Sequence, residues 1–357
     1  MRPVPEPGER DGSPAPPSAS RLPHSLRRRS ALLGAGATAL LTLVSLGSVL
    51  VVRGTAGDAP SAAGADGGPG GRSGSLTASL PWPDEGQAAV LVEGFGPRGA
   101  TGVHGPRRPV PIASVTKVMT AYVVLRDHPL RGDASGPLVT VDEQAANESF
   151  SGAESTVEVR QGQRLSQRRL LELMLVPSGN NIARLLARWD AGSQEAFVAR
   201  MNRAADDLGM DHTTYTGASG IEPTTTSTAA DQLKLARQVM RDDVFRSIVS
   251  LPRTAAAVGS GTIPNSNELL DTPGVTGIKT GSSTPAGGAL MWASDVADRS
   301  GRRHLALGVV LHQRAGTSPQ EGLRTAFDSG RKLVEEVRHR VAAADPTATS
   351  GAPSRTR

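Results

Sequence analysis

Residues 112–125 read IASVTKVMTAYVVL and place Ser114 three positions before Lys117 in an otherwise apolar segment. Because the segment is apolar almost all round, it predicts a buried helix over residues 114–125. A spacing of three puts the hydroxyl and the amine on one helical face, one turn apart. Burial disfavours an ammonium, and a lysine with a lowered pKa can act as a general base beside a hydroxyl nucleophile. The alternative is that Ser114 only caps the helix and Lys117 extends toward solvent.

Basic residues are used unevenly along the chain. Of the 39 Lys and Arg, only four are lysines, namely Lys117, Lys234, Lys279 and Lys332. Only lysine can lose its proton near neutral pH, since the arginine side chain stays charged. A lysine retained in such a chain is therefore a candidate for chemistry that arginine cannot perform.

Two further short motifs follow Ser114 and Lys117 in the chain. Ser178-Gly-Asn180 falls between helices predicted over residues 166–176 and 180–189, where a simple cap and turn is the alternative. Lys279-Thr280-Gly281 ends a strand predicted over residues 274–281, where a glycine turn is the alternative. Each motif alone is weak, but two of the four lysines fall in two of these three motifs, which lie in a meaningful order. Together they favour a catalytic site.

The segments around these motifs predict a mixed α/β domain. Strands come at both ends of it, with a helical block between them, which indicates one mixed sheet packed against helices and an inserted helical subdomain. The other predicted strands are residues 87–96, 100–105, 289–297 and 304–312. The other predicted helices are residues 193–208, residues 227–244 with Ser227 as the cap, and residues 319–341.

With these motifs in place, the chain resembles the serine D-alanyl-D-alanine carboxypeptidases, which are low-molecular-mass penicillin-binding proteins. Their superfamily carries SxxK, a Ser/Asn motif and KTG. The resemblance extends through LLELMLVPSGNNIARLLA, LGM…ASGI…STAADQLKLAR and NSNELLDTPGVTGIKTG, and it covers roughly residues 85–340. It implies the β-lactamase/transpeptidase-like fold, a five-stranded antiparallel sheet flanked by helices, with the active site between the sheet and the helical subdomain.

The resemblance implies catalytic roles for four residues. Ser114 would be the acylated nucleophile, and Lys117 the base that takes its proton. Ser178 would relay a proton toward the leaving amine. Asn180 would hold Lys117 and the substrate amide.

The third motif is implied to bind the substrate, a peptidoglycan stem peptide ending in D-Ala-D-Ala. Lys279 and Thr280 would bind its terminal carboxylate, and Gly281 would let the strand edge come close. The backbone N–H groups of Ser114 and Ser282 would form the oxyanion hole. β-Lactams would inhibit by acylating the same serine. Neither a cofactor nor a metal is implied.

Departures from the family pattern concern the region after the third motif. Many relatives carry a C-terminal β-domain and a terminal amphipathic membrane helix, but 76 residues follow Gly281 here. We expect that domain to be missing and anchoring to occur at the N-terminus. Residues 282–284 read Ser-Ser-Thr where an aromatic residue is common, which leaves the fine substrate preference open.

Three other functions compete with the carboxypeptidase. A D,D-endopeptidase that cuts cross-links has the same motifs and stays open. The best-known β-lactamases use a glutamate some 36 residues past the second motif, but residues 213–217 read TTYTG and contain no acid. An inactive wall-binding scaffold would be expected to lose Ser114, Lys117 or Lys279, and all three are present.

The two ends of the chain are expected to lie outside the catalytic domain of residues 76–342. Residues 1–30 and 343–357 are predicted to be disordered tails, and residues 53–75 a flexible linker. Residues 31–52 are 22 residues without a charge, which predicts a transmembrane signal anchor. Three arginines precede this run, so we expect a cytoplasmic tail and an extracytoplasmic catalytic domain on a single-pass cell-membrane protein. A cleaved, secreted form is the alternative.

Composition excludes several other classes of function. The net charge is +5, but residues 1–30 alone hold six Arg against three acids, and only 3% of residues are aromatic. The body of the chain therefore offers neither a basic stripe nor stacking platforms for nucleic acid. The full sequence contains no cysteine, and its seven histidines show no metal-ligand spacing, so no disulfide and no metal site is expected.

Overall fold

The computed structural model describes residues 76–95 and 99–344. The predicted tail at residues 1–30, the apolar run 31–52 and the linker 53–75 lie outside these residues. Of the tail predicted at residues 343–357, residues 345–357 also lie outside them, whereas Ala343 is the last residue of a helix and not part of a disordered tail. Among the helices of the described ranges, none combines the length and the apolar character that crossing a bilayer requires.

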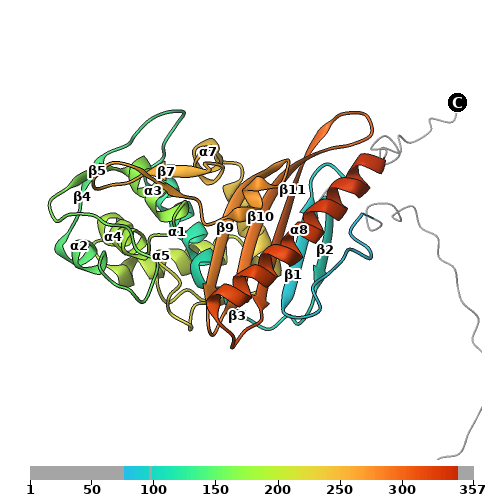
Figure 1. Cartoon of the computed structure of the whole chain (residues 1–357), viewed down its shortest axis with the longest axis horizontal. Helices are drawn as coiled ribbons and strands as arrows, with labels where there is room; N and C mark the ends of the chain where they lie inside the picture. The colour runs from blue at the N-terminus through green and yellow to red at the C-terminus, as the bar shows by residue number, and fades with distance from the viewer. Residues whose placement is uncertain (1–75, 96–98, 345–357) are drawn as a thin grey trace, which may run out of the picture. The chain divides into compact units, whose positions relative to one another are not determined.

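A five-stranded antiparallel sheet forms the centre of the domain, in the order β2-β1-β11-β10-β9 (Figure 1). The bounds of the strands are β1 Gln87–Val92, β2 Ala100–His104, β9 Val275–Ser283, β10 Gly287–Ala297 and β11 Arg303–Gln313. The first strand of the chain pairs with the last, Gln87 opposite Leu311. Both ends of the domain therefore build one sheet, which confirms the predicted fold class.

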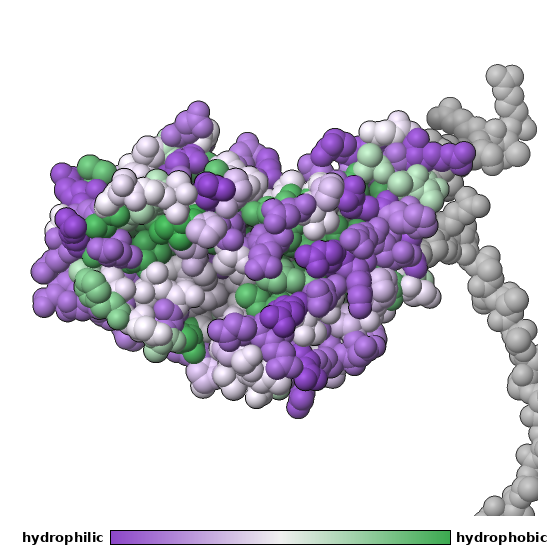
Figure 2. Space-filling view, in the orientation of Figure 1, coloured by the Kyte–Doolittle hydropathy of each residue, from purple (hydrophilic) through white to green (hydrophobic). Residues whose placement is uncertain are grey.

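Both faces of the sheet are covered. Helix α8, Pro319–Ala343, crosses one face, and its outward side is polar (Figures 1 and 2). The helical subdomain packs against the other face and extends past the edge strand β9 (Figure 1). Successive residues of β1 accordingly enter different cores: Ala89 and Leu91 pack with the helical subdomain, whereas Ala88 and Val90 pack with α8. This alternation is the period-two pattern of a strand buried on both sides.

The subdomain between β2 and β9 is built mainly around helices joined by long loops. The longer ones are α1 Lys117–Asp127, α3 Gln167–Leu175, α4 Asn180–Ala191, α5 Gln194–Asp207, α6 Ala229–Val239 and α7 Asp243–Val249. Short elements that we did not predict are β3 Val110–Pro111, β4 Leu138–Thr140, α2 Glu143–Glu148, β5 Arg164–Ser166, β6 Thr226–Ser227, β7 Arg253–Ala255, β8 Thr262–Pro264 and η2 Glu268–Asp271.

Two helix predictions need correction. The single helix expected over residues 227–244 is two helices, α6 and α7, because the side chain of Asp242 accepts a hydrogen bond from the Phe245 N–H and starts a new helix there. The cap of α6 is Thr228 rather than Ser227. The helix expected from residue 114 begins as a 3₁₀ turn, η1 Ala113–Thr116, and becomes α-helical only at Lys117.

Candidate active site

Ser114 and Lys117 are brought together by the 3₁₀ turn η1. In a 3₁₀ helix, residues three apart lie directly above one another, which aligns the two side chains more closely than an α-helix does. The Nζ atom of Lys117 lies 2.8 Å from the Oγ atom of Ser114. The turn is held by the Thr116 hydroxyl, which donates to the Ala113 carbonyl at 2.7 Å. A candidate nucleophile and a candidate base are therefore in direct contact.

Lys117 is fully buried, so the alternative in which it extends toward solvent is wrong. Its ammonium also donates to Asn180 Oδ1 at 2.5 Å and to the Ser219 carbonyl at 2.8 Å. Burial, followed by the nearby charges of Lys279 and Arg184, holds the pKa of Lys117 well below its ordinary value. A lysine in this setting can release its proton at a pH where an exposed lysine cannot.

The second motif forms the junction between α3 and α4. Gly179 is the N-cap of α4 and Asn180 its first residue, so the Asn180 side chain extends from the start of the helix to Lys117. Ser178 is buried and has a positive φ of 69°, an unusual conformation for a non-glycine residue. Its hydroxyl makes no hydrogen bond to any other residue that the structure describes.

The third motif lies on β9, the edge strand that faces the helical subdomain. Lys279 and Thr280 are buried, and both contact the Ser266 hydroxyl, at 3.4 Å from Lys279 Nζ and 2.8 Å from Thr280 Oγ1. Burial lowers the pKa of Lys279 to about 7. No carboxylate within residues 76–95 and 99–344 forms an ion pair with Lys279, so its charge is uncompensated in this part of the chain.

Gly281 is required by the close approach of β9 to the 3₁₀ turn. A Cβ atom added there would lie 2.8 Å from the Ser114 backbone nitrogen and 3.1 Å from the Ile112 carbonyl oxygen. Contacts this short to backbone atoms leave no room for a side chain. The strand edge and the turn carrying Ser114 can therefore pack together only with glycine at this position.

An open cleft of ≈ 460 Å³ lies over these motifs. Its lining includes Ser114, Asn180 and Ser282, while Lys117, Ser178 and Lys279 are buried and do not line it. The remaining lining comes from residues 152–155 and 220–221, the start of α8, and the Ser283 and Thr284 that follow the third motif. The cleft is thus lined by one residue of the first motif, one of the second, and the residue that follows the third.

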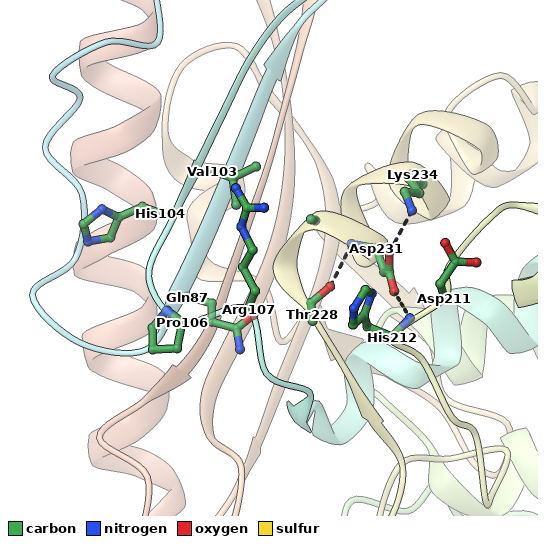
Figure 3. A pocket seen from close by; sticks show the side chains of 11 residues that line it. Gln87, Val103, His104, Pro106, Arg107, Asp211, His212, Thr228, Asp231 and Lys234 are labelled. Carbon is green, nitrogen blue, oxygen red and sulfur yellow. Dashed lines mark hydrogen bonds and ion pairs between the residues drawn. The ribbon is translucent and has the colours of Figure 1, made fainter.

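A second cavity, of ≈ 290 Å³, contains none of the predicted site residues (Figure 3). It lies where β1 and the segment after β2 meet the start of α6. Within it, Asp231 accepts hydrogen bonds from Lys234 and from the backbone of His212. The bond from His212 ties the start of α6 to the segment before it, and none of the three motifs lines this cavity.

Several functional candidates were missed by sequence reasoning. Glu154 accepts a hydrogen bond from Asn180 Nδ2 at 2.5 Å, and Arg184 forms an ion pair with Glu154 at 2.6 Å. Ser219 and Ser266 contact Lys117 and Lys279 as described above. Arg184, Ser219 and Ser266 lie in stretches that carry the family resemblance, but none is part of the three motifs, and Glu154 lies outside those stretches. A further signal was Arg184 itself, a charged residue in the otherwise apolar face of a predicted helix.

A serine hydroxyl that contacts a buried lysine, near a strand that carries a second buried lysine, is the arrangement expected of serine acyl-transfer enzymes with a lysine base. Comparison with known proteins agrees. The family model described as D-alanyl-D-alanine carboxypeptidase matches residues 100–312. The chain belongs to this family and is a serine-type hydrolase, as its resemblance indicated.

Individual relatives support the same assignment. A D-alanyl-D-alanine carboxypeptidase of Streptomyces sp. (strain K15) is 33% identical over 214 residues, which are 56% of this chain and 71% of that protein. A D-alanyl-D-alanine endopeptidase of Pseudomonas aeruginosa is 39% identical over 132 residues, 37% of this chain and 40% of that one. The crystal structure of the Streptomyces DD-transpeptidase superposes with a TM-score of 0.59 at 26% identity, covering 71% of this chain and 95% of that one.

Proposed function

We propose that the chain removes the terminal D-alanine from peptidoglycan stem peptides through an acyl-enzyme on Ser114. The observation that carries this proposal is the contact between the fully buried Lys117 amine and the Ser114 hydroxyl at 2.8 Å. In its neutral form, Lys117 accepts the Ser114 proton as the serine oxygen attacks the carbonyl carbon of the D-Ala-D-Ala bond.

Collapse of the tetrahedral intermediate breaks the C–N bond. The backbone N–H groups of Ser114 and Ser282 stabilise the negative oxygen, and donors aimed in this way each contribute a factor of about 10² to 10³. Lys117 returns the Ser114 proton through the Ser178 hydroxyl to the leaving amine, so D-alanine departs and Lys117 is neutral again. Water then attacks the ester carbonyl, and Lys117 takes a proton from the water. When the C–O bond to Ser114 breaks, this proton passes to the Ser114 oxygen, and the shortened peptide is released.

Recognition of the terminal carboxylate is assigned to Lys279 and Thr280. Lys279 is a buried cation whose contact with Ser266 at 3.4 Å is long and whose charge has no carboxylate partner among the described residues. A buried charge is strongly disfavoured until it is paired. An incoming carboxylate would supply that pair, which favours substrates that end in a free carboxyl group.

The first experiment follows release of D-alanine from a peptide ending in D-Ala-D-Ala and, in parallel, the mass of the full chain with benzylpenicillin. We expect D-alanine release and a persistent single adduct on Ser114, both absent in Ser114→Ala. A variant at Ser114 that keeps D-alanine release would overturn the assignment. An adduct that disappears as penicillin is consumed would indicate a β-lactamase instead.

A D,D-endopeptidase is the second candidate, because a relative of that name is 39% identical over part of the chain. In an endopeptidase the bond cut lies within a cross-link, so the residue after the cleaved bond carries a further amide. Incubation with a cross-linked peptide dimer distinguishes the two functions: cleavage to monomers without D-alanine release from the linear peptide would favour the endopeptidase.

We place the reaction outside the cytoplasm, at the cell wall. The support is family membership and the uncharged run of residues 31–52 after three arginines. Anchoring through that run is part of the proposal. Fractionation of cells expressing the full chain checks it, since an anchored protein sediments with membranes and resists extraction by alkaline carbonate.

A further inference from the structure

A carboxylate that no motif contains lies in the wall of the catalytic cleft. Glu154 belongs to the segment between α2 and β5, and one of its oxygens, Oε2, accepts from Asn180 Nδ2 at 2.5 Å. Arg184 on α4 donates to both oxygens, at 2.6 Å to Oε1 and 3.2 Å to Oε2. Arg184 is itself anchored by Glu148 at 2.9 Å. Arg184 thus binds the Glu154 carboxylate, and the same carboxylate binds the side chain of Asn180.

The segment carrying Glu154 is tied to the start of α4. Asn181 is fully buried and binds both polar groups of the Val157 backbone, donating to the carbonyl at 2.8 Å and accepting from the N–H at 3.0 Å. The Asn180 N–H donates to the Ser155 carbonyl at 2.8 Å. Ser155 and Val157, which closely follow Glu154 in the chain, are therefore fixed to the start of α4, and this holds Glu154 beside Asn180.

This contact determines which way the Asn180 amide faces. An ionised carboxylate only accepts hydrogen bonds, so Asn180 must turn its NH₂ group toward Glu154. The oxygen of the amide then faces Lys117, which donates to it at 2.5 Å. The flipped amide would set NH₂ against the ammonium and oxygen against the carboxylate, so both contacts would become repulsive.

We propose that Glu154 is a positioning residue of the reaction, which holds the Asn180 amide with its oxygen toward Lys117, while Arg184 holds Glu154. The proposal rests on the function proposed above, because Glu154 acts through Asn180 and Lys117. Arg184 also keeps Glu154 from serving as a base. Burial raises the pKa of Glu154, but hydrogen bonds from Arg184 and Asn180 outweigh burial and lower it.

The charges around Lys117 provide a readout that a merely structural role would not change. Four charged side chains face it: Lys279 on β9, Arg184 on α4, Glu154, and Glu222 in the segment after Ser219. The two cations lower the pKa of Lys117 and the two carboxylates raise it. Neutralising Glu154 should therefore lower this pKa further, and neutralising Arg184 should raise it.

The experiment measures the second-order rate constant for acylation of Ser114 by benzylpenicillin against pH, using the full chain. We compare Glu154→Gln, Glu154→Ala and Arg184→Gln with Glu158→Gln, which neutralises an exposed carboxylate of the same segment that makes no hydrogen bond to other described residues. We expect Glu154→Ala to lose about 10- to 100-fold, consistent with losing a charged hydrogen bond. Glu154→Gln should recover part of this loss, because its amide oxygen can still accept from Asn180.

The acidic limb of the profile reports the base. We expect it to move to lower pH in Glu154→Gln and to higher pH in Arg184→Gln, while Glu158→Gln stays at the wild-type position. A Glu154→Gln profile that coincides with that of Glu158→Gln in height and position would overturn the proposal, whether or not Arg184→Gln folds. If the wild type itself forms no adduct on Ser114, the proposed function fails and not the role of Glu154 alone.

Discussion

The amine of Lys117 lies 2.8 Å from the Ser114 hydroxyl, and no carboxylate in the described part of the chain contacts that amine. Its direct partners are a hydroxyl, an amide oxygen and a backbone carbonyl, all of which are neutral. An ammonium in such surroundings is destabilised by burial without being neutralised by an ion pair. The arrangement therefore favours the neutral amine, which is the form that can accept the serine proton.

Replacing Lys117 should abolish acylation even when the charge is kept. We expect Lys117→Arg and Lys117→Met each to lose about 10²- to 10⁴-fold in the rate of Ser114 acylation, the usual contribution of a general base. Arginine cannot release its proton in this range. Rapid-mixing mass spectrometry with benzylpenicillin measures the rate, and circular dichroism checks the fold. Retention of activity within tenfold in a folded Lys117→Arg chain would exclude lysine as the base.

Acylation by an anionic ligand should have a bell-shaped pH dependence. It needs Lys117 neutral and Lys279 charged, and the pKa of Lys279 is about 7 in the free protein. The rate constant should rise with pH as Lys117 loses its proton, then fall as pH passes about 7 and Lys279 loses its charge. The methyl ester of benzylpenicillin has no carboxylate, so its alkaline limb should be missing. If benzylpenicillin and its methyl ester give the same alkaline limb, the carboxylate of the ligand does not pair with Lys279.

We expect the buried charge of Lys279 to lower the free energy of unfolding, although the same side chain is proposed to bind the substrate. Its pKa is about 7 when folded and near 10.5 when unfolded, so between these values the unfolded chain binds more protons and stability rises with pH. Below pH 7 the full cost is present. We expect Lys279→Met to raise the free energy of unfolding at pH 6 by about 1 to 4 kcal/mol, the range seen when buried charges are replaced by apolar groups. This gain should fade toward pH 10.5.

Urea unfolding at both pH values measures this effect, with Lys332→Met as the matched control. Lys332 is exposed on α8, and such a surface change usually alters stability by less than about 0.5 kcal/mol. A Lys279→Met chain that is less stable than the wild type at pH 6 would contradict the expected cost of the buried charge.

Side chains at residue 281 should separate β9 from the turn carrying Ser114. A Cβ there meets the Ser114 nitrogen at 2.8 Å and the Val115 nitrogen at 3.0 Å, and both belong to backbone that cannot rotate away. We expect Gly281→Ala to lose about 10²-fold in acylation, because displacements near 1 Å disturb reacting groups on that scale. Gly281→Val should lose more. Equal rates in the glycine, alanine and valine proteins, at similar melting temperatures, would refute the close-packing argument.

Strong local patterns made much of the fold predictable. Alternating and continuous apolar runs located β1, β9, β10 and β11, and the amphipathic pattern located α8 within two residues at its end. The short strands and α2 were missed because two to six residues carry too little periodicity. The break between α6 and α7 was missed because the cap at Asp242 outweighed a continuous helical pattern.

The three motifs could be read from the sequence, because the proposed chemistry requires serine, lysine and asparagine side chains at those spacings. The residues that surround the motifs could be identified only from the folded chain. Glu154 lies outside every stretch that carries the resemblance, and Ser219 and Ser266 lie outside the three motifs. They reach Asn180, Lys117 and Lys279 only when distant parts of the chain pack together. The pKa values of Lys117 and Lys279 could likewise not be predicted from the sequence. Desolvation depends on the side chains that pack around each lysine in the folded chain, and not on its neighbours in the sequence.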